Sequence, residues 1–495
     1  MATFGGADKD PQVPRFAKNV SDLLVDLEGA GGFFSGKVLD YRMACTAAAD
    51  RTCQIVVNLS VWNEFLLWIN LELRESPQPE RQLRLERIYH KLDWLDRTDR
   101  EKEQRQATTA LFWLLKTHRC VARICIPSEV YDRCFPILRE AFYGNSSLKS
   151  LTLEASLNSK LWKVIASMKG LEELECSGTK NARPRSISAL LQSTQTLTVL
   201  KFSETYGIEN SLSQRFLAAL KANKTLRVLS INSDAIAGDP DLFAEIMGDS
   251  NTLQDVTVIS AHSSRPSDMK WVLRVDVWWR ALSMSLRLNR SIVKLGVGVG
   301  SDGGDNVRHL GEAVSRSPTI RKFHLLSFDK IELAAFLRGL RTEIFDNYAL
   351  CSAVFETKPI LMDLAAYWFE VSDTARRNYG LVVRAAHFLK DLRSDRLCAA
   401  ALERVSRHPA LVAELAEVLR IGETEAANAV RQRFQEMQGL HDFMRLAGVV
   451  RDRVRCEDDG STQLDALDSR CWLHVRRYLR LDDVACDLAE PPSSP

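Results

Sequence analysis

The clearest repeat in this chain is Leu226-Arg-Val-Leu229-Ser-Ile231-Asn-Ser-Asp234-Ala-Ile236, which has apolar residues at its first, fourth, sixth and last positions. This spacing is typical of a short β-strand that runs into a turn, with alternate side chains facing a core. Phe216-Leu-Ala-Ala-Leu220 precedes it and predicts a short helix, which the polar group Asn223-Lys-Thr225 closes. The stretch therefore predicts a unit of helix, polar cap and strand.

The same unit recurs along the chain. Its first apolar residue, the anchor, is found at nine positions that are 23 to 39 residues apart: Val121, Leu148, Leu171, Leu197, Leu226, Leu253, Ile292, Ile320 and Leu350. A polar cap precedes most anchors, as in Asn145-Ser-Ser147, Ser250-Asn-Thr252, Asn289-Arg-Ser291, Ser317-Pro-Thr319 and Asn347-Tyr-Ala349. One unit cannot bury its apolar face alone, so the units must stack. An α/β domain without repeats is the alternative, but a fixed period with a recurring cap favours a solenoid.

This period resembles the ribonuclease-inhibitor-like class of leucine-rich repeats, which is also found in NLR receptors. Within it, Leu111-Phe-Trp-Leu-Leu-Lys-Thr-His-Arg-Cys120 and Asn378-Tyr-Gly-Leu-Val-Val-Arg-Ala-Ala386 resemble segments of arthropod proteins described as NLR family CARD domain-like. The resemblance covers roughly residues 110–480 and implies an α/β leucine-rich-repeat solenoid (horseshoe) of about nine units. Most units lack the asparagine of the strand turn, so a regular asparagine ladder is not expected there.

The regions on either side of the repeats predict α-helical caps, which cover the open ends of a solenoid. Residues 397–408, 409–420 and 423–449 predict successive amphipathic helices, with Pro409 suited to a first turn and Gly422 to a helix stop. The expected organisation is a disordered start (1–15), a helical N-terminal cap (16–118), the repeats (119–356), a helical C-terminal region (357–456), a linker with a last helix (457–488) and a disordered tail (489–495).

The composition is typical of a globular protein with several structural units. The 495 residues are too many for one compact core, and 45% are apolar and 26% charged. A net charge of +2 gives no support for binding nucleic acid or an anionic membrane. Residues 1–14 lack a secretory signal pattern, no apolar run is long enough to span a bilayer, and the 11 cysteines are scattered. We therefore expect a cytoplasmic protein with free thiols.

One segment imitates a phosphate-binding loop. Gly31-Gly-Phe-Phe-Ser-Gly36-Lys37-Val38 fits G-x-x-x-x-G-K, but Val38 stands where a Mg²⁺-binding Ser or Thr is needed. Bulky Phe33 and Phe34 would also crowd the phosphate. A glycine-rich turn between helices is the favoured interpretation, and a nucleotide-binding protein is a distant alternative that a loss of nucleotide affinity in Lys37→Ala would support.

The densest set of metal-capable residues in the sequence is His118, Cys120, Cys125 and Cys134. Their spacing is not that of a zinc site, and Cys125 is expected on the first repeat strand, so we interpret them as buried thiols rather than metal ligands. The sequence has no hydrolase, metalloprotease or cysteine-protease signature. We expect no catalytic residues, no metal and no cofactor.

The segment Ala466-Leu467-Asp-Ser-Arg-Cys471-Trp-Leu-His-Val475 resembles a BC-box, the helix by which some substrate receptors dock onto Elongin C. On one helix, an apolar stripe for a partner groove would be formed by Leu467, Cys471, Val475 and Tyr478. The stretch also resembles the first half of an F-box, although Asp468 replaces the usual proline. Both resemblances imply a cullin-RING ubiquitin ligase, with Elongin C or a Skp-type adaptor and a cullin as partners. A helix that only packs on its neighbours is the alternative.

The sequence thus predicts a non-catalytic scaffold that recognises a protein ligand on the concave face of the sheet, and a ligase substrate receptor is the second hypothesis. Residues between the inward leucines face solvent in this architecture. The candidate binding residues there are Lys149, Thr152, Glu172, Glu175, Lys201, Arg227, Ser230, Thr257, Lys294 and His324. The sequence has neither a nucleotide-binding domain nor a clear CARD, which argues against a signalling ATPase.

Overall fold

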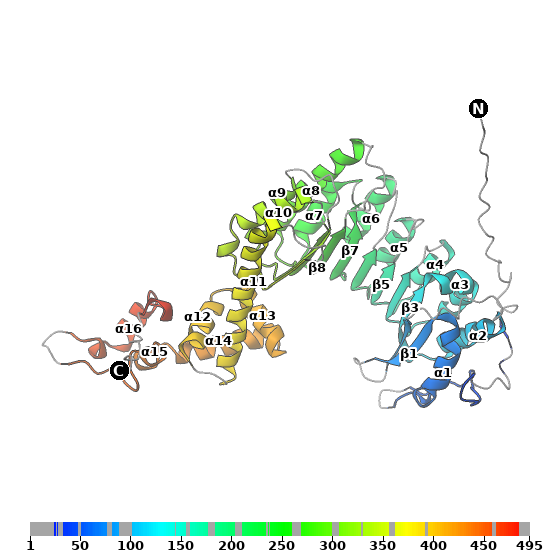
Figure 1. The fold of residues 1–495 in the computed structure, drawn as a ribbon, viewed down its shortest axis with the longest axis horizontal. Coiled ribbons are helices and arrows are strands. Elements are labelled where there is room, and N and C mark those ends of the chain that lie inside the picture. Colours follow the sequence, from blue (N-terminus) through cyan, green and yellow to red (C-terminus); the bar gives the residue numbers. More distant parts are fainter. Residues whose placement is uncertain are drawn as a thin grey trace. The chain divides into compact units, whose positions relative to one another are not determined.

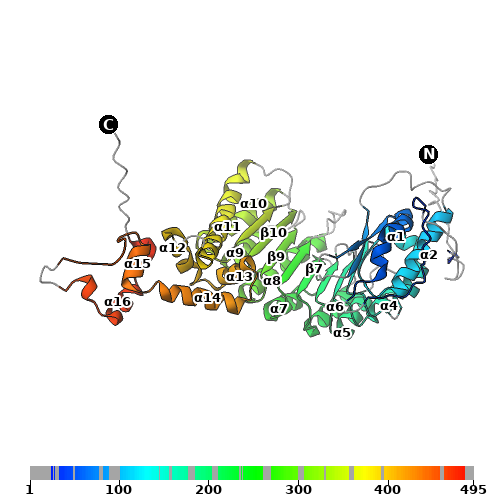
Figure 2. The same ribbon diagram turned by 90° about the horizontal axis from the view of Figure 1, so that it is seen from below.

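The computed structural model describes residues 24–484 except 26, 28–32, 48–50, 77–81, 89–100, 144, 155–158, 177–183, 203–209, 234–235, 237, 260–268, 299–305, 328–329, 356–361, 392–394 and 458–461. Helices alternate with an 11-stranded, mostly parallel sheet whose strands follow one another in chain order (Figures 1 and 2). This solenoid-like arrangement confirms the α/β class. The chain divides into two compact units, Met1–Ile246 with Val256–Ser263 and Met247–Asp255 with Ser264–Pro495.

The first unit contains β1 to β7 and all of β8 except Asp255, which belongs to the second unit. Strands β1 (Leu71–Glu75) and β2 (Leu83–Arg87) form an antiparallel pair, and β2 then pairs in parallel with β3 (Val121–Pro127). The remaining strands are β4 (Ser150–Glu154), β5 (Glu173–Cys176), β6 (Val199–Phe202), β7 (Val228–Asn232) and β8 (Asp255–Ile259). The helices are α1 (Leu59–Leu66), α2 (Glu101–Thr117), α3 (Ser128–Phe142), α4 (Ser159–Ala166), α5 (Pro184–Ser193), α6 (Asn210–Ala222) and α7 (Pro240–Asp249).

Strand alternation places the core of the first unit between sheet and helices. In β4, Leu151 and Leu153 are fully buried, whereas Thr152 between them is partly exposed. Helices α3 to α6 follow one another along one side of the strands (Figure 1) and bury residues such as Trp162 and Leu217 against them. All nine predicted anchors are buried, and a strand begins at the first anchor or two residues after each of the others. The periodicity therefore predicted the repeat strands, from Val121 onward, correctly.

Polar caps hold most of the turns between helix and strand. The Oδ1 of Asn223 accepts hydrogen bonds from the amides of Thr225 (3.0 Å) and Leu226 (2.9 Å). Its Nδ2 donates to the carbonyl of Leu191 in the preceding repeat (3.1 Å). Asn145, Asn289 and Asn347 make the same set of bonds. Ser250 and Ser317 accept through Oγ from the corresponding two amides, but among the described residues they make no bond to the preceding repeat that corresponds to the asparagine Nδ2 bond. Cap and anchor recur together because the side chain of the cap residue binds the amide of the anchor. Where the cap is asparagine, the same side chain also bonds to the preceding repeat.

The second unit contains β9 (Lys294–Gly298), β10 (Lys322–Ser327) and β11 (Ser352–Phe355) with α8 (Met269–Leu288), α9 (Asn306–Arg316) and α10 (Lys330–Arg341). Trp278 and Trp279 of α8 are buried core residues. A helical region then follows: α11 (Met362–Leu389), α12 (Arg396–Val405), α13 (Pro409–Leu419), α14 (Glu423–Glu436), α15 (Leu440–Leu446) and α16 (Ser469–Arg476).

Helix α11 closes the last repeat turn. The buried Asn378 donates from Nδ2 to the carbonyl oxygens of Asn347 (2.9 Å) and Leu350 (2.8 Å), and Arg377 donates to that of Phe345 (2.6 Å). Carbonyl groups that a further repeat would have bonded thus receive side-chain donors instead.

The structure differs from the expected boundaries in two places. The segment predicted as an all-helical cap contains the β1–β2 pair, because Leu71, Leu73, Leu83 and Leu85 alternate with polar residues and bury one face. The helix predicted over 423–449 is two helices, and Gly439 is the N-cap of the second. Among the described residues, every helix is too short or too polar to cross a membrane, and each described cysteine is a free thiol.

Candidate functional site

Parallel pairing in the first unit brings the predicted binding residues into rows. Thr152 of β4 is in register with Glu175 of β5, Glu175 with Lys201 of β6, and Lys201 with Ser230 of β7. All four are partly exposed, and the residues on either side of each point into the core. The row therefore forms a continuous polar strip on the face of the sheet opposite its buried side.

A second row lies one residue after each anchor. The carbonyl of Lys149 accepts a hydrogen bond from the amide of Glu172, that of Glu172 from Thr198, and that of Thr198 from Arg227, each 2.8 Å long. Lys149 is half-exposed, and Glu172 and Arg227 are exposed. Thr257 of β8 is also half-exposed, in the middle of its strand. In the second unit, Lys294 pairs in register with Lys322 and His324 with Gly296.

Charges on these rows pair between neighbouring repeats. Lys149 Nζ lies 2.7 Å from Glu172 Oε1, Lys201 Nζ 3.5 Å from Glu175 Oε2, and Lys294 Nζ 2.9 Å from Asp255 Oδ2. Such solvent-exposed pairs contribute at most about 1 kcal/mol each. They are therefore easily exchanged for pairs with a ligand, and they leave the strip polar with a balanced charge.

Helix α13 covers the second row at β10. Arg321 follows its anchor as Lys149 and Arg227 follow theirs, yet it is only 5% exposed. Its guanidinium lies 2.8 Å from both Glu414 and Glu417 of α13, and Glu417 also binds Lys322 at 2.6 Å. Burial raises the pKa of Glu417, but Lys322 and Arg321 outweigh it and hold that pKa below the usual range. The exposed row thus stops short of β10. No sequence pattern predicts this cover, because Arg321 and Glu414 are 93 residues apart.

The segment that imitates a phosphate-binding loop binds a carboxylate of the chain itself. The amides of Phe34 and Ser35 donate to Oε2 of Glu64 on α1, at 3.1 and 3.2 Å. Burial raises the pKa of Glu64, but these bonds and the charge of Lys37 hold it below its usual range. Lys37 is exposed, and no helix follows it directly. In the described part of this segment, residues 33–38, Glu64 therefore occupies the amides of Phe34 and Ser35, and the helix N-terminus that a phosphate loop uses is lacking.

The C-terminal segment is a shorter helix than expected. Asp468 is the N-cap of α16 and accepts from the amide of Cys471 at 2.7 Å, so Leu467 lies before the helix and Tyr478 after it. The prediction that Leu467, Cys471, Val475 and Tyr478 share one helical face is therefore wrong for the first and last of them. For Leu467 the cause is Asp468, whose carboxylate starts a new helix at Ser469.

The opposite side of α16 is anchored in the C-terminal helical core. Trp472 is buried, donates from Nε1 to the carbonyl of Gln438 (2.7 Å) and contacts the ring of Phe443. The buried Arg476 pairs with the buried Glu403 at 2.9 Å. Cys471, Val475 and Tyr478 are consequently exposed, whereas Leu467 is half-buried.

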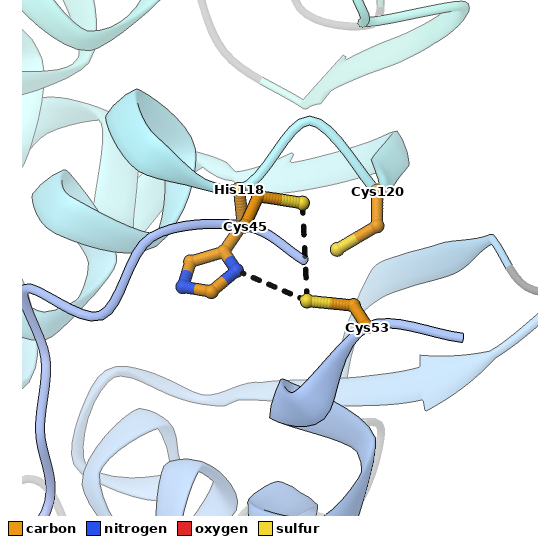
Figure 3. Close-up of side chains that lie close together, drawn as sticks. All are labelled: Cys45, Cys53, His118 and Cys120. Carbon is orange, nitrogen blue, oxygen red and sulfur yellow. Dashed lines mark hydrogen bonds between the residues drawn. The ribbon is translucent and has the colours of Figure 1, made fainter. Parts of the chain in front are cut away.

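The structure regroups the metal-capable residues. His118 and Cys120 lie in the turn between α2 and β3 and meet Cys45 and Cys53 from the segment before α1 (Figure 3). Cys134 contacts Thr108 on α2, and Cys125 lies on β3 near Glu154, so neither joins the group. Burial lowers the pKa of His118, and burial together with the neighbouring Cys45 and Cys53 raises that of Cys120.

Comparison with known proteins gave no relatives: the chain matches no family model, and a search of curated proteins found no match.

Proposed function

We propose that this chain is a non-catalytic, cytoplasmic leucine-rich-repeat scaffold that binds a protein ligand on the exposed face of its sheet. One observation carries the proposal: Thr152, Glu175, Lys201 and Ser230 project in register from four consecutive strands whose other faces are packed with leucine. An ordered strip in which two opposite charges are flanked by hydroxyl groups suits a polar protein surface. The free thiols of the described cysteines favour a reducing compartment.

Site-specific photo-crosslinking tests this surface. A photoreactive residue at Ser230 should capture a discrete protein, whereas the same group at Lys221 on α6 is the matched control on the helical side of the unit. Arginine introduced at Ser230 or Thr152 should abolish that capture without lowering the melting temperature, because both positions are partly exposed. Equal crosslinking from Ser230 and Lys221 would count against the proposal.

A second candidate function is substrate reception in a cullin-RING ligase, with α16 as the docking helix. The observation that favours it is the exposure of Cys471 and Val475 on α16 and of Tyr478 just after it, while the other side of this helix is anchored. Affinity purification of the intact chain should recover Elongin C or a Skp-type adaptor together with a cullin. Recovery should be lost in Leu467→Ala/Cys471→Ala and kept in Arg477→Ala, a change of an exposed residue next to the helix. If the intact chain captures none of these proteins, α16 is a packing helix.

A further inference from the structure

Two separate segments bring four metal-ligating side chains together. The segment before α1 contributes Cys45 and Cys53, and the turn after α2 contributes His118 and Cys120. Figure 3 shows all four side chains pointing toward one common space. Their ligand atoms all lie within 4.8 Å of one another, although Cys53 and His118 are 65 residues apart in the chain.

The separations match a tetrahedral metal site. Zinc bonds of about 2.3 Å to sulfur and about 2.0 Å to nitrogen place neighbouring ligand atoms about 3.8 Å (S···S) and about 3.5 Å (S···N) apart. Here Cys45 Sγ lies 3.8 Å from Cys53 Sγ, which is far too long for a disulfide, and Cys53 Sγ lies 3.6 Å from His118 Nδ1. The nitrogen that faces the sulfur atoms is thus the one that would bind the ion.

The local structure holds both segments in this arrangement. Thr46 Oγ1 accepts from the amide of Gln54 at 2.9 Å, which fixes one end of the Cys45–Cys53 loop to the other. The carbonyl of Cys120 accepts from the amide of Leu83 at 2.8 Å, which attaches the α2–β3 turn to β2. The ring of His118 lies edge-on to the buried Trp62, with centroids 5.9 Å apart.

Burial makes this cluster unlike a chance group of surface thiols. Cys53 and His118 are each 1% exposed and Cys120 5%, and only Cys45 is half-exposed. His118 Nε2 is buried without a hydrogen-bond partner among the described residues, so the orientation of the ring is set by its packing and by what Nδ1 binds.

We propose a structural Zn²⁺ site with three thiolates and one imidazole Nδ1 as ligands, contributed by Cys45, Cys53, His118 and Cys120. Soft sulfur ligands in a tetrahedron select zinc over the hard cations Mg²⁺ and Ca²⁺. Binding releases one proton from each thiol to solvent and requires no redox change. Four protein ligands leave no open coordination position, so the ion is structural: it clamps the segment before α1 to the start of the repeats.

The test uses the full chain purified under reducing conditions. Elemental analysis should find about one zinc per chain, and Co²⁺ replacement should give the intense visible absorption of a tetrahedral ion with sulfur-to-cobalt charge transfer in the near ultraviolet. Cys45→Ser and Cys53→Ser should remove metal and spectrum. Cys125→Ser and Cys134→Ser are the matched controls and should retain both, because their side chains lie outside the cluster.

The spectrum of the unaltered chain decides the question even if a cluster variant fails to fold. Sulfur-to-cobalt absorption that Zn²⁺ displaces supports the site. A folded chain that carries no metal and develops no sulfur-to-cobalt absorption when Co²⁺ is added overturns it. So does a Cys45–Cys53 disulfide in the freshly purified chain, or metal that is lost in Cys125→Ser but kept in Cys45→Ser.

Discussion

Two glycines allow helices α9 and α10 to meet at backbone distance. A Cβ built on Gly339 would lie 2.0 Å from the carbonyl oxygen of Arg308, and one on Gly311 would lie 2.3 Å from that of Phe336. Backbone atoms cannot move aside as a flexible side chain can, so any side chain here must push the helices apart.

We expect Gly339→Ala to destabilise the second unit by about 1–3 kcal/mol, the usual cost of overpacking a closely packed contact. Gly380→Ala is the matched control. It lies within α11, and its Cβ would meet only the end of the Arg384 side chain at 3.8 Å. This control should be neutral or stabilising by up to about 1 kcal/mol, because alanine favours helix. Chemical unfolding followed by tryptophan fluorescence measures both, and equal midpoints for the two variants would contradict the prediction.

Glu64 should make the folded state sensitive to acid. Its pKa is lowered in the folded chain, so its carboxylate contributes stability above the unfolded-state pKa near 4.5 and loses it as the pH falls through the lower folded pKa. Glu64→Gln should therefore destabilise the chain at pH 7 and have little effect once the pH is well below 4.5. Melting temperatures of both proteins across this range measure the difference. A difference in melting temperature that persists at low pH would show that the charge of the carboxylate does not cause the destabilisation.

At the scale of elements, the contact between α13 and β10 depends on a buried ion pair. Arg321 and Glu414 are almost fully buried, and their side chains lie 2.8 Å apart. The free-energy cost of removing two charges from water is offset by their attraction only while both partners are present. Losing one partner therefore leaves an unpaired charge in the interior.

Arg321→Met alone should therefore cost about 3–5 kcal/mol, whereas Arg321→Met with Glu414→Leu should recover most of that loss. The recovery will be incomplete because Glu417 also binds Arg321. A double-mutant cycle on the unfolding free energy measures the coupling. Additive effects of the two substitutions would mean that the pair has no special role. Lys221→Ala, which breaks the exposed Lys221–Glu245 pair on the helices α6 and α7, is the control and should cost less than about 1 kcal/mol.

At the scale of the whole molecule, the proposed zinc site predicts a local effect of metal removal. A structural ion contributes its binding free energy to folding, about 4 kcal/mol when free Zn²⁺ is about 1,000 times the Kd. Chelation should thus raise amide hydrogen exchange in α1, α2 and the start of β3 by up to about a thousandfold. Helices α12 to α16, which belong to the other unit, serve as the internal control and should not change. Exchange that rises equally in both regions would contradict a local clamp.

The sequence by itself determined the repeat strands, the polar caps between helix and strand, and the α/β class. These features depend on contacts between residues close in the chain, such as the bonds that Asn223 Oδ1 accepts from the amides of Thr225 and Leu226. They therefore produce a regular spacing that can be recognised in the sequence. The same alternation placed Thr152, Glu175, Lys201 and Ser230 together on one face of the sheet, because in-register pairing follows from equal repeats.

Only the tertiary structure decided which distant side chains meet. Proximity in the chain favours grouping His118 and Cys120 with Cys125 and Cys134, whereas folding brings Cys45 and Cys53 to them. Likewise, no sequence pattern indicates that α13 covers Arg321, or that Asp468 starts α16 after Leu467 rather than before it. The physical reason is that these contacts arise where separate segments cross. Their partners are chosen by packing in three dimensions, and a single sequence carries no periodic signal of that choice.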